Sequence, residues 1–264
     1  MLGARLATAA VAIPVLLAII FLAPPYVLSL LIFVLGGIAL VEYMGMALPE
    51  KATERWLGVS AGTIVLAVFV SLAAPGPLVM AAITGVLALA IASVLFRAVD
   101  LHGGIHDVAL SLLGILYVAV LAHFVWLHHL TDGPRWVAFL VANGMASDTG
   151  AYFAGRGFGR HKLLPRVSPA KTIEGAVGAL VAAAAIGAAA QWVLFPAEGM
   201  LSMIVLAVVL AAVGQVGDLC ESAMKRAFAA KESGWIFPGH GGVLDRIDSL
   251  LFPVAILYYY RAAL

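Results

Sequence analysis

The chain consists of one apolar run after another, each nearly free of charge. An α-helix needs roughly 18 or more predominantly apolar residues to cross the hydrocarbon core of a bilayer, and such runs recur along all 264 residues. Hydrophobic residues make up 64% of the sequence and charged residues 11%, against about 25% charged residues in an average soluble domain. Because a soluble core of this size cannot bury so much apolar surface, the sequence predicts an integral membrane protein.

Proline and glycine breakers divide the runs into about nine expected spans. These lie at 5–22, 25–47, 56–73, 77–96, 106–129, 135–155, 172–195, 200–224 and 242–261. We therefore predict an all-α, polytopic fold, with about five spans in residues 1–134 and about four in residues 135–264. The first run has the alternative of a signal peptide, although it is long for one and a second run follows almost at once.

The basic residues orient these spans, because cytoplasmic loops are enriched in Lys and Arg. With a cytoplasmic N-terminus, all of the 15 basic residues except Arg135 and Arg261 fall on the cytoplasmic side. An eight- or ten-span arrangement would move one of the two polar connections, 156–171 or 225–241, to the outside. The compact, Ala-rich chain fits a bacterial inner membrane. Its dispersed basic residues exclude a nucleic-acid binder.

Acidic residues within the apolar spans are the first sign of chemistry, since charges at membrane depth usually face a bundle interior or a wet cavity. Asp218 and Glu221 share one face of the eighth span, and Asp245 and Asp248 have the same spacing at the start of the ninth. The connection between these spans folds back, so the two carboxylate faces are expected to meet near the cytoplasmic surface. Such a group suits Mg²⁺. The alternative is a set of buried ion pairs with Lys225, Arg226 and Arg246.

Two further spans carry polar residues, and one carries a stripe of small ones. Glu42 is an acid in the second span. Asp148 in the sixth span lies near Asn143, Ser147 and Tyr152, which favours an internal site over lipid contact. Small residues in the seventh span are expected to allow close helix packing: Gly175, Gly178 and Ala179. The single Cys220 excludes an internal disulfide and a Cys-based metal cluster.

Both polar connections are suited to bind phosphate. In the later one, glycines flank His240 and permit close backbone approach, so that N–H groups can form an anion nest; a structural histidine is the alternative. In the earlier one, Ser168-Pro169 has the pattern of a helix start. A phosphate could bind at that helix N-terminus with Lys171 in reach, whereas plain capping is the alternative.

The stretch 222–248 resembles the pattern of the phosphatidate cytidylyltransferases, and the resemblance is strongest over 143–253. It is carried by Ser222, Lys225-Arg226, Lys231-Glu232, Pro238-Gly239-His240-Gly241-Gly242 and Asp245-Arg246-Ile247-Asp248, with Ser147 to Tyr152 and Ser168 to Gly175 upstream. There are two departures. The family's Lys-Asp is Lys231-Glu232 here, and Ala170 stands where the family often has a second lysine, which leaves Lys171 to act alone.

The resemblance implies transfer of the cytidylyl group of CTP to phosphatidic acid, with Mg²⁺ held by Asp218, Asp245 and Asp248 and a second cation allowed. The implied catalytic residues are Asp218, Lys225, Arg226, Lys231, His240, Asp245, Arg246 and Asp248. The implied substrate-binding residues are Asp148, Ser168, Lys171, Thr172, Glu221, Ser222, Gly239, Gly241 and Gly242. The alternatives are another lipid acceptor and an ion-coupled transporter, although no internal repeat is visible. The first five spans offer a lipid path or the face of a homodimer.

Overall fold

The computed structural model describes residues 2–71, 76–96, 100–234 and 241–263. Over these residues the chain forms ten helices and one two-stranded hairpin. They are α1 (Leu2–Phe21), α2 (Pro25–Ala47), α3 (Ala52–Ser71), α4 (Pro77–Phe96), α5 (Leu101–Ala119), α6 (Ala122–His128), α7 (Gly133–Phe158), β1 (Lys162–Leu164), β2 (Ser168–Thr172), α8 (Ile173–Val193), α9 (Met200–Ala227) and α10 (Leu244–Ala262). Gly239 and His240, both expected in the site, lie outside the described residues.

Each expected span has a helical counterpart, and the fifth one is divided into α5 and α6. Among the described residues, six helical stretches are long and apolar enough to cross a membrane: Pro25–Ala47, Ala52–Ser71, Pro77–Val94, Leu101–His128, Ile173–Val193 and Met200–Ala227. The protein is therefore a mostly helical, polytopic membrane protein, as predicted. The hairpin between α7 and α8 is an addition that the apolar pattern did not reveal.

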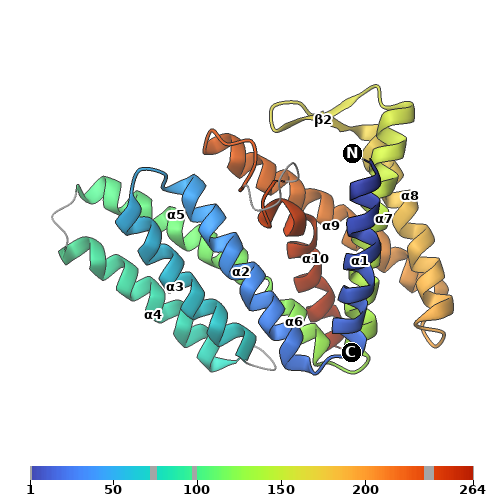
Figure 1. Cartoon of the computed structure of the whole chain (residues 1–264), viewed down its shortest axis with the longest axis horizontal. Coiled ribbons are helices and arrows are strands. Elements are labelled where there is room, and N and C mark those ends of the chain that lie inside the picture. The colour runs from blue at the N-terminus through green and yellow to red at the C-terminus, as the bar shows by residue number, and fades with distance from the viewer. Residues whose placement is uncertain (1, 72–75, 97–99, 235–240, 264) are drawn as a thin grey trace.

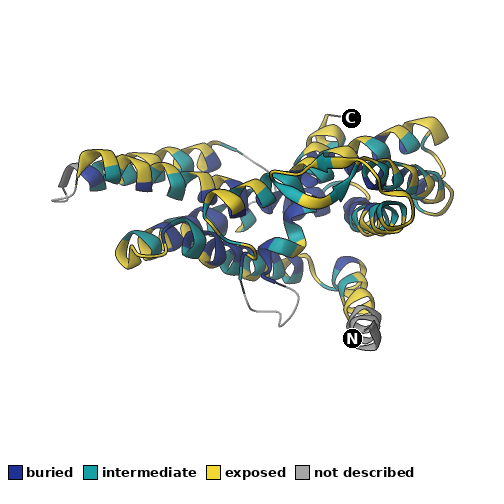
Figure 2. Ribbon diagram, turned by 90° about the horizontal axis from the view of Figure 1, so that it is seen from above, coloured by how far each residue is buried: buried dark blue, intermediate teal, exposed yellow. Residues whose placement is uncertain are grey.

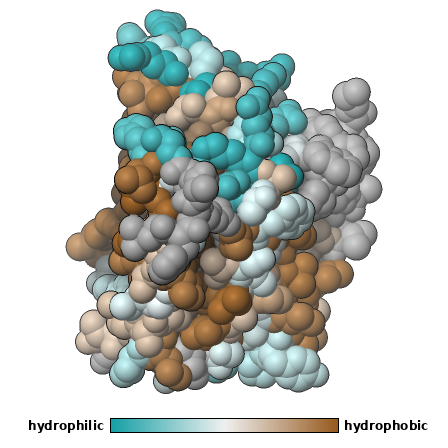
Figure 3. Space-filling view, turned by 90° about the vertical axis from the view of Figure 1, so that its left-hand side faces the viewer, coloured by the Kyte–Doolittle hydropathy of each residue, from teal (hydrophilic) through white to brown (hydrophobic). Residues whose placement is uncertain are grey.

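The outer faces of the helices are apolar, the reverse of a soluble protein. Leu22 is 82% exposed, and Trp192 and Val193 at the end of α8 are each 77% exposed. Buried residues gather where the helices face one another, and exposed residues cover the outside (Figure 2). In Figure 3, hydrophilic residues gather toward one end of the molecule and hydrophobic residues cover much of the rest. This distribution fits a protein whose sides contact lipid.

The helices form two groups that α9 and α10 connect (Figure 1). Helices α2 to α5 pack together on one side, and α7 and α8 pack together on the other. The hairpin lies at the same end of the molecule as the N-terminus, whereas the C-terminus lies at the opposite end. The two long polar connections come directly after α7 and α9 in the sequence. The C-terminal ends of both helices lie toward the hairpin end of the molecule (Figure 1).

Small residues bring α7 and α8 close together, as the sequence predicted. A Cβ atom placed on Gly178 would overlap the Cβ of Ala154 and crowd the carbonyl oxygen of Gly150. A Cβ on Gly150 would in turn overlap the carbonyl oxygen of Gly178. The two helix backbones thus touch directly, which is the packing mode available in lipid, where the hydrophobic effect does not drive helix association.

The expected helix start at Ser168-Pro169 is wrong, because these residues belong to β2. Strands β1 and β2 are antiparallel, with Leu164 opposite Ser168 and Lys162 opposite Thr172. Helix α8 begins only at Ile173, and the Thr172 hydroxyl accepts a hydrogen bond from the backbone N–H of Gly175 (3.1 Å). Proline is tolerated in β2 because every strand of a two-stranded ribbon is an edge strand. Thr172 supplies the capping oxygen instead.

Candidate active site between the last four long helices

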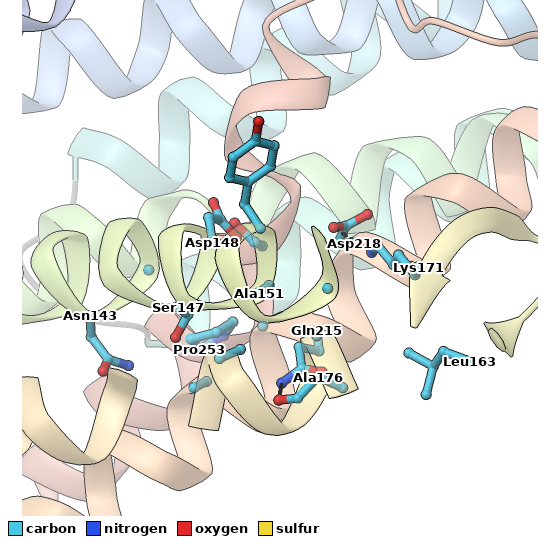
Figure 4. A pocket seen from close by; sticks show the side chains of 18 of the residues that line it. Asn143, Ser147, Asp148, Ala151, Leu163, Lys171, Ala176, Gln215, Asp218 and Pro253 are labelled. Atoms are coloured by element: carbon cyan, nitrogen blue, oxygen red, sulfur yellow. Dashed lines mark hydrogen bonds and ion pairs between the residues drawn. The ribbon is translucent and has the colours of Figure 1, made fainter. Parts of the chain in front are cut away.

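A cavity of about 490 Å³ lies between α7, α8, α9 and α10 and reaches β2. Its inner wall is formed mainly by apolar and small side chains, including Leu140, Ala179, Leu210, Leu250 and Pro253. Asp148, Lys171 and Asp218 also line it, and Lys171 lies beside Asp218 at one end while Asn143 lies at the other (Figure 4). The cavity therefore combines a long apolar part with a charged part next to the hairpin.

An ion pair between Lys171 and Asp218 forms the charged part of the cavity. Their side chains are 29% and 31% exposed, so the pair borders the open space. The Ser222 hydroxyl lies 3.5 Å from Oδ1 of Asp218, one helical turn along α9. Asp148 of α7 interacts electrostatically with both members of the pair and with Arg246. Residues from four elements thus meet here, and three of them, Asp148, Lys171 and Asp218, are among the expected site residues.

A second, more buried charge cluster lies where α9 meets α10. Nζ of Lys225 is 2.5 Å from Oε2 of Glu221 and 2.5 Å from Oδ1 of Asp245. The three side chains are only 11%, 1% and 13% exposed, in the order Lys225, Glu221, Asp245. The two carboxylate faces expected from the i, i+3 spacing therefore do converge, and they do so around one lysine.

The Asp245 carboxylate also fixes the residues around the start of α10. Its Oδ2 accepts hydrogen bonds from the backbone N–H of Ser233 (2.9 Å), the Ser233 hydroxyl (2.8 Å) and the backbone N–H of Gly242 (2.8 Å). Gly241 has a φ of +76°, a left-handed conformation that glycine adopts without steric cost. Gly241 and Gly242, the two described glycines of the predicted anion nest, thus allow the backbone to turn around the Asp245 carboxylate.

Asp248 lies one turn further along α10 and is buried. Its Oδ1 accepts a hydrogen bond from the backbone N–H of Ser249 (2.6 Å), and the like charges of Asp218 and Glu221 act on it. Within the described part of the chain, no three His, Cys, Asp or Glu side chains are arranged to hold one metal ion together. Asp218, Asp245 and Asp248 instead contact different partners: Lys171, Lys225 and the backbone N–H of Ser249, respectively. The three aspartates together therefore do not form one cation site. Mg²⁺ needs only one or two carboxylates when waters and phosphate oxygens complete its shell, and Asp218 and Asp248 fit that requirement because Asp218 acts electrostatically on Asp248.

The remaining predicted residues occupy different places. Arg226 contacts the hairpin: its Nε donates to the carbonyl oxygen of Val167 (3.3 Å), and its Nη1 donates to that of Ala230 (3.2 Å). Lys231 is exposed, and so is Glu232, the position of the family departure. Thr172 caps α8, and Ser168 is half-buried in β2. Arg226 thus links the two polar connections to each other and does not line the cavity.

Two residues near the site were not predicted to act in it. Ser233 is 5% exposed and donates to Asp245. Glu42 of α2 is 7% exposed and accepts hydrogen bonds from the first residues of α10. Glu42 gave a signal as an acid inside an apolar span, but its sequence position does not indicate which loop it meets. Ser233 gave no signal beyond its place in the polar connection.

These features define a helical membrane protein with a charged, partly apolar cavity beside two basic connections. A model of the Cytidylyltransferase family matches residues 3–264, which is nearly the whole chain. The chain therefore belongs to the cytidylyltransferase family.

Individual relatives match a shorter stretch. A phosphatidate cytidylyltransferase of Bacillus subtilis is 37% identical over 158 residues, covering 59% of this chain and 59% of the relative. One of Staphylococcus saprophyticus is 38% identical over 152 residues, covering 57% of this chain and 58% of the relative. One of Brucella suis is 48% identical over 130 residues, covering 49% and 48%. The chain thus matches about half the length of these curated relatives.

Proposed function

We propose that this protein transfers the cytidylyl group of CTP to phosphatidic acid, giving CDP-diacylglycerol and pyrophosphate. The observation that carries the proposal is the cavity between α7, α8, α9 and α10. The Lys171–Asp218 ion pair lies at one end of it, and the rest of its lining is mainly apolar. Such a cavity suits a substrate with a phosphate head and an apolar body. The family membership and the printed names of the relatives support the same reaction.

We further propose that all nine expected spans cross the membrane, with α5 and α6 together forming one of them, and that the site faces the cytoplasm of a bacterial cell. The hairpin and the end of α9 lie toward the end that holds the N-terminus, and these connections carry many of the basic residues (Figure 1). Arg135 and Arg261 belong to the N-terminal part of α7 and the C-terminal part of α10, toward the other end. This asymmetry matches the enrichment of Lys and Arg in cytoplasmic loops.

The proposed chemistry needs positioning and charge stabilisation more than proton transfer. An oxygen of the lipid phosphate forms a bond to the α-phosphorus of CTP. The bond from that phosphorus to the oxygen bridging to the β-phosphorus breaks, and pyrophosphate leaves with the bonding electron pair. The nucleophile is already anionic, so a strong general base is not required. Lys171, at the cavity, would exchange its partner Asp218 for a phosphate oxygen, while Lys225 keeps Glu221 and Asp245 in place.

We propose that Mg²⁺ would be held by Asp218 and Asp248, the better suited of the three expected ligands. Asp245 already accepts hydrogen bonds from Lys225, Ser233 and Gly242. Asp218 borders the cavity, and the negative charges of Asp218 and Glu221 act on Asp248. When bound, the cation would neutralise the triphosphate and stabilise charge on the departing pyrophosphate. The catalytic roles expected for Arg226, Lys231, His240 and Arg246, a second cation, and a homodimer stay predictions.

The decisive experiment measures pyrophosphate release by the purified, detergent-solubilised protein with CTP and phosphatidic acid, with and without Mg²⁺. Release that requires all three, together with a CDP-lipid product, is the expected result. If the folded protein binds CTP but releases no pyrophosphate, a panel of other phosphorylated lipids identifies the acceptor. If it does not bind CTP at all, the proposal fails, and ion-flux measurements in liposomes then test the transporter alternative.

A further inference from the structure

We infer that Glu42, on a helix of the N-terminal half, is a positioning residue for the site. Its carboxylate holds the first turn of α10, and with it Asp245 and Asp248. The inference deepens the proposed function and rests on it for the reaction, whereas the contacts themselves stand independently. Glu42 does not touch the cavity, so its role is exerted through α10.

The side chain of Glu42 caps a helix that is more than half the chain away in sequence. Oε1 of Glu42 accepts a hydrogen bond from the backbone N–H of Val243 (2.9 Å), and Oε2 accepts one from the backbone N–H of Leu244 (2.9 Å). The N–H groups at a helix start have no acceptor within the helix. Val243 stands at the N-cap position of α10 and has no side-chain acceptor. Glu42 supplies the missing acceptors, and its negative charge suits the positive end of the helix dipole.

The fit around this carboxylate is close. A Cβ atom built on Gly234 would overlap the carboxylate of Glu42, and so would one built on Gly242. Backbone from both sides of the α9–α10 connection therefore lies directly against Glu42. The next residue, Tyr43, packs edge-on against Phe228 at the end of α9, with ring centroids 5.7 Å apart. Helix α2 thus contacts the region where α9 ends and the region where α10 begins.

The Ser233 hydroxyl lies between Glu42 and the charge cluster. It lies 3.2 Å from Oε2 of Glu42 and 2.8 Å from Oδ2 of Asp245. Its one proton can serve one carboxylate at a time, and Asp245 is the nearer. Asp245 in turn accepts a hydrogen bond from Lys225. A shift in the first turn of α10 would move Asp245 directly and Asp248 one turn further along the same helix.

The Glu42→Gln variant tests this inference, since it keeps the shape of the side chain. A carboxamide has one acceptor oxygen, and its NH₂ group would face a backbone N–H donor. Asp107→Asn is the matched control: Asp107 is 8% exposed and accepts from Lys51 at 2.7 and 2.6 Å, but it lies on α5, away from α10. Both variants and the wild type are reconstituted in lipid nanodiscs and studied by amide hydrogen exchange and by steady-state turnover.

We expect Glu42→Gln to speed exchange in peptides covering 241–250 at least tenfold, with peptides from α5 and α7 unchanged. We also expect a tenfold or larger loss in kcat with the KM for phosphatidic acid within threefold, because the site is misplaced rather than closed. Asp107→Asn should change neither. Unchanged exchange at 241–250, or a rise spread over all helices, would overturn the positioning role. If the wild type shows no turnover, the proposed reaction has failed, and the exchange result still decides the role of Glu42.

Discussion

Nζ of Lys225 lies 2.5 Å from Oδ1 of Asp245, although 20 residues separate them in the sequence. The same ammonium group lies 2.5 Å from Oε2 of Glu221 on its own helix. One lysine therefore ties the end of α9 to the start of α10 and compensates two carboxylates at once. This contact holds the two ends of the α9–α10 connection together.

We predict that Lys225→Met strongly destabilises the protein and removes activity. The substitution leaves Glu221 and Asp245 without their shared cation, and removing one partner of a buried ion pair costs about 3–5 kcal/mol. Turnover should fall at least ~100-fold, equivalent to about 2.7 kcal/mol in barrier height. Thermal unfolding in micelles and pyrophosphate release measure the two effects. Arg135→Met is the control, because Arg135 and its partner Asp132 are 52% and 51% exposed, so that no buried carboxylate is left unpaired; an equal loss in both variants would contradict the prediction.

We predict that Asp218→Asn abolishes turnover and leaves membrane insertion and folding intact. Asp218 is 31% exposed at the cavity, so the neutral, equally large amide leaves no buried charge unpaired. The loss of negative charge weakens any cation site and frees Lys171. Pyrophosphate release reports activity, and the unfolding temperature of the purified protein reports folding. A fully active variant would remove Asp218 from the proposed metal site.

We predict that Ala170→Lys leaves activity within about tenfold, or 1.4 kcal/mol in barrier height. Ala170 is exposed on β2 and lines the cavity beside Lys171. A second lysine can therefore extend into solvent without displacing packed side chains. Steady-state kinetics with CTP and phosphatidic acid check this. A much larger change in either direction would mean that Lys171 does not carry the role of this segment alone.

We predict that Gly178→Ala lowers the unfolding temperature, because the added methyl group forces α7 and α8 apart. Overpacking of this kind typically costs about 1–3 kcal/mol. Gly37 on α2 is the matched control, since a Cβ there would meet nothing within 4 Å. Gly37→Ala should be neutral or slightly stabilising, because alanine favours a helix over glycine. Thermal unfolding in the same detergent compares the two, and equal shifts would show that the close contact at Gly178 is unimportant.

Much of the architecture could be predicted because its signals are local. An apolar run long enough to cross a bilayer specifies a helix wherever it occurs, since every backbone polar group must be satisfied within the segment. The i, i+3 spacing likewise places Asp218 and Glu221 on one helix face whatever surrounds them. The choice between a cation site and ion pairs was left open for Lys225. The structure gives it two carboxylate partners.

The local pattern failed at Ser168-Pro169, where contacts from outside the segment decided the structure. Ser168-Pro169 is a good helix start in isolation, yet the chain pairs these residues with β1 and begins α8 after Thr172. Glu174 favours this outcome, because its carboxylate accepts from the backbone N–H groups of Arg160 and His161, which precede β1 at the open end of the hairpin. Those contacts depend on the hairpin being formed, so no window of sequence around Ser168 contains them.

By itself the sequence determined the membrane location, the succession of helices, and the acids and bases gathered in the last third of the chain. Only the tertiary structure decided which charges meet: Lys171 with Asp218, Lys225 with Asp245, and Glu42 with the start of α10. The physical reason is one of range. Helix formation and lipid exposure depend on neighbours within a few turns, whereas the partner of a buried charge depends on how distant helices pack.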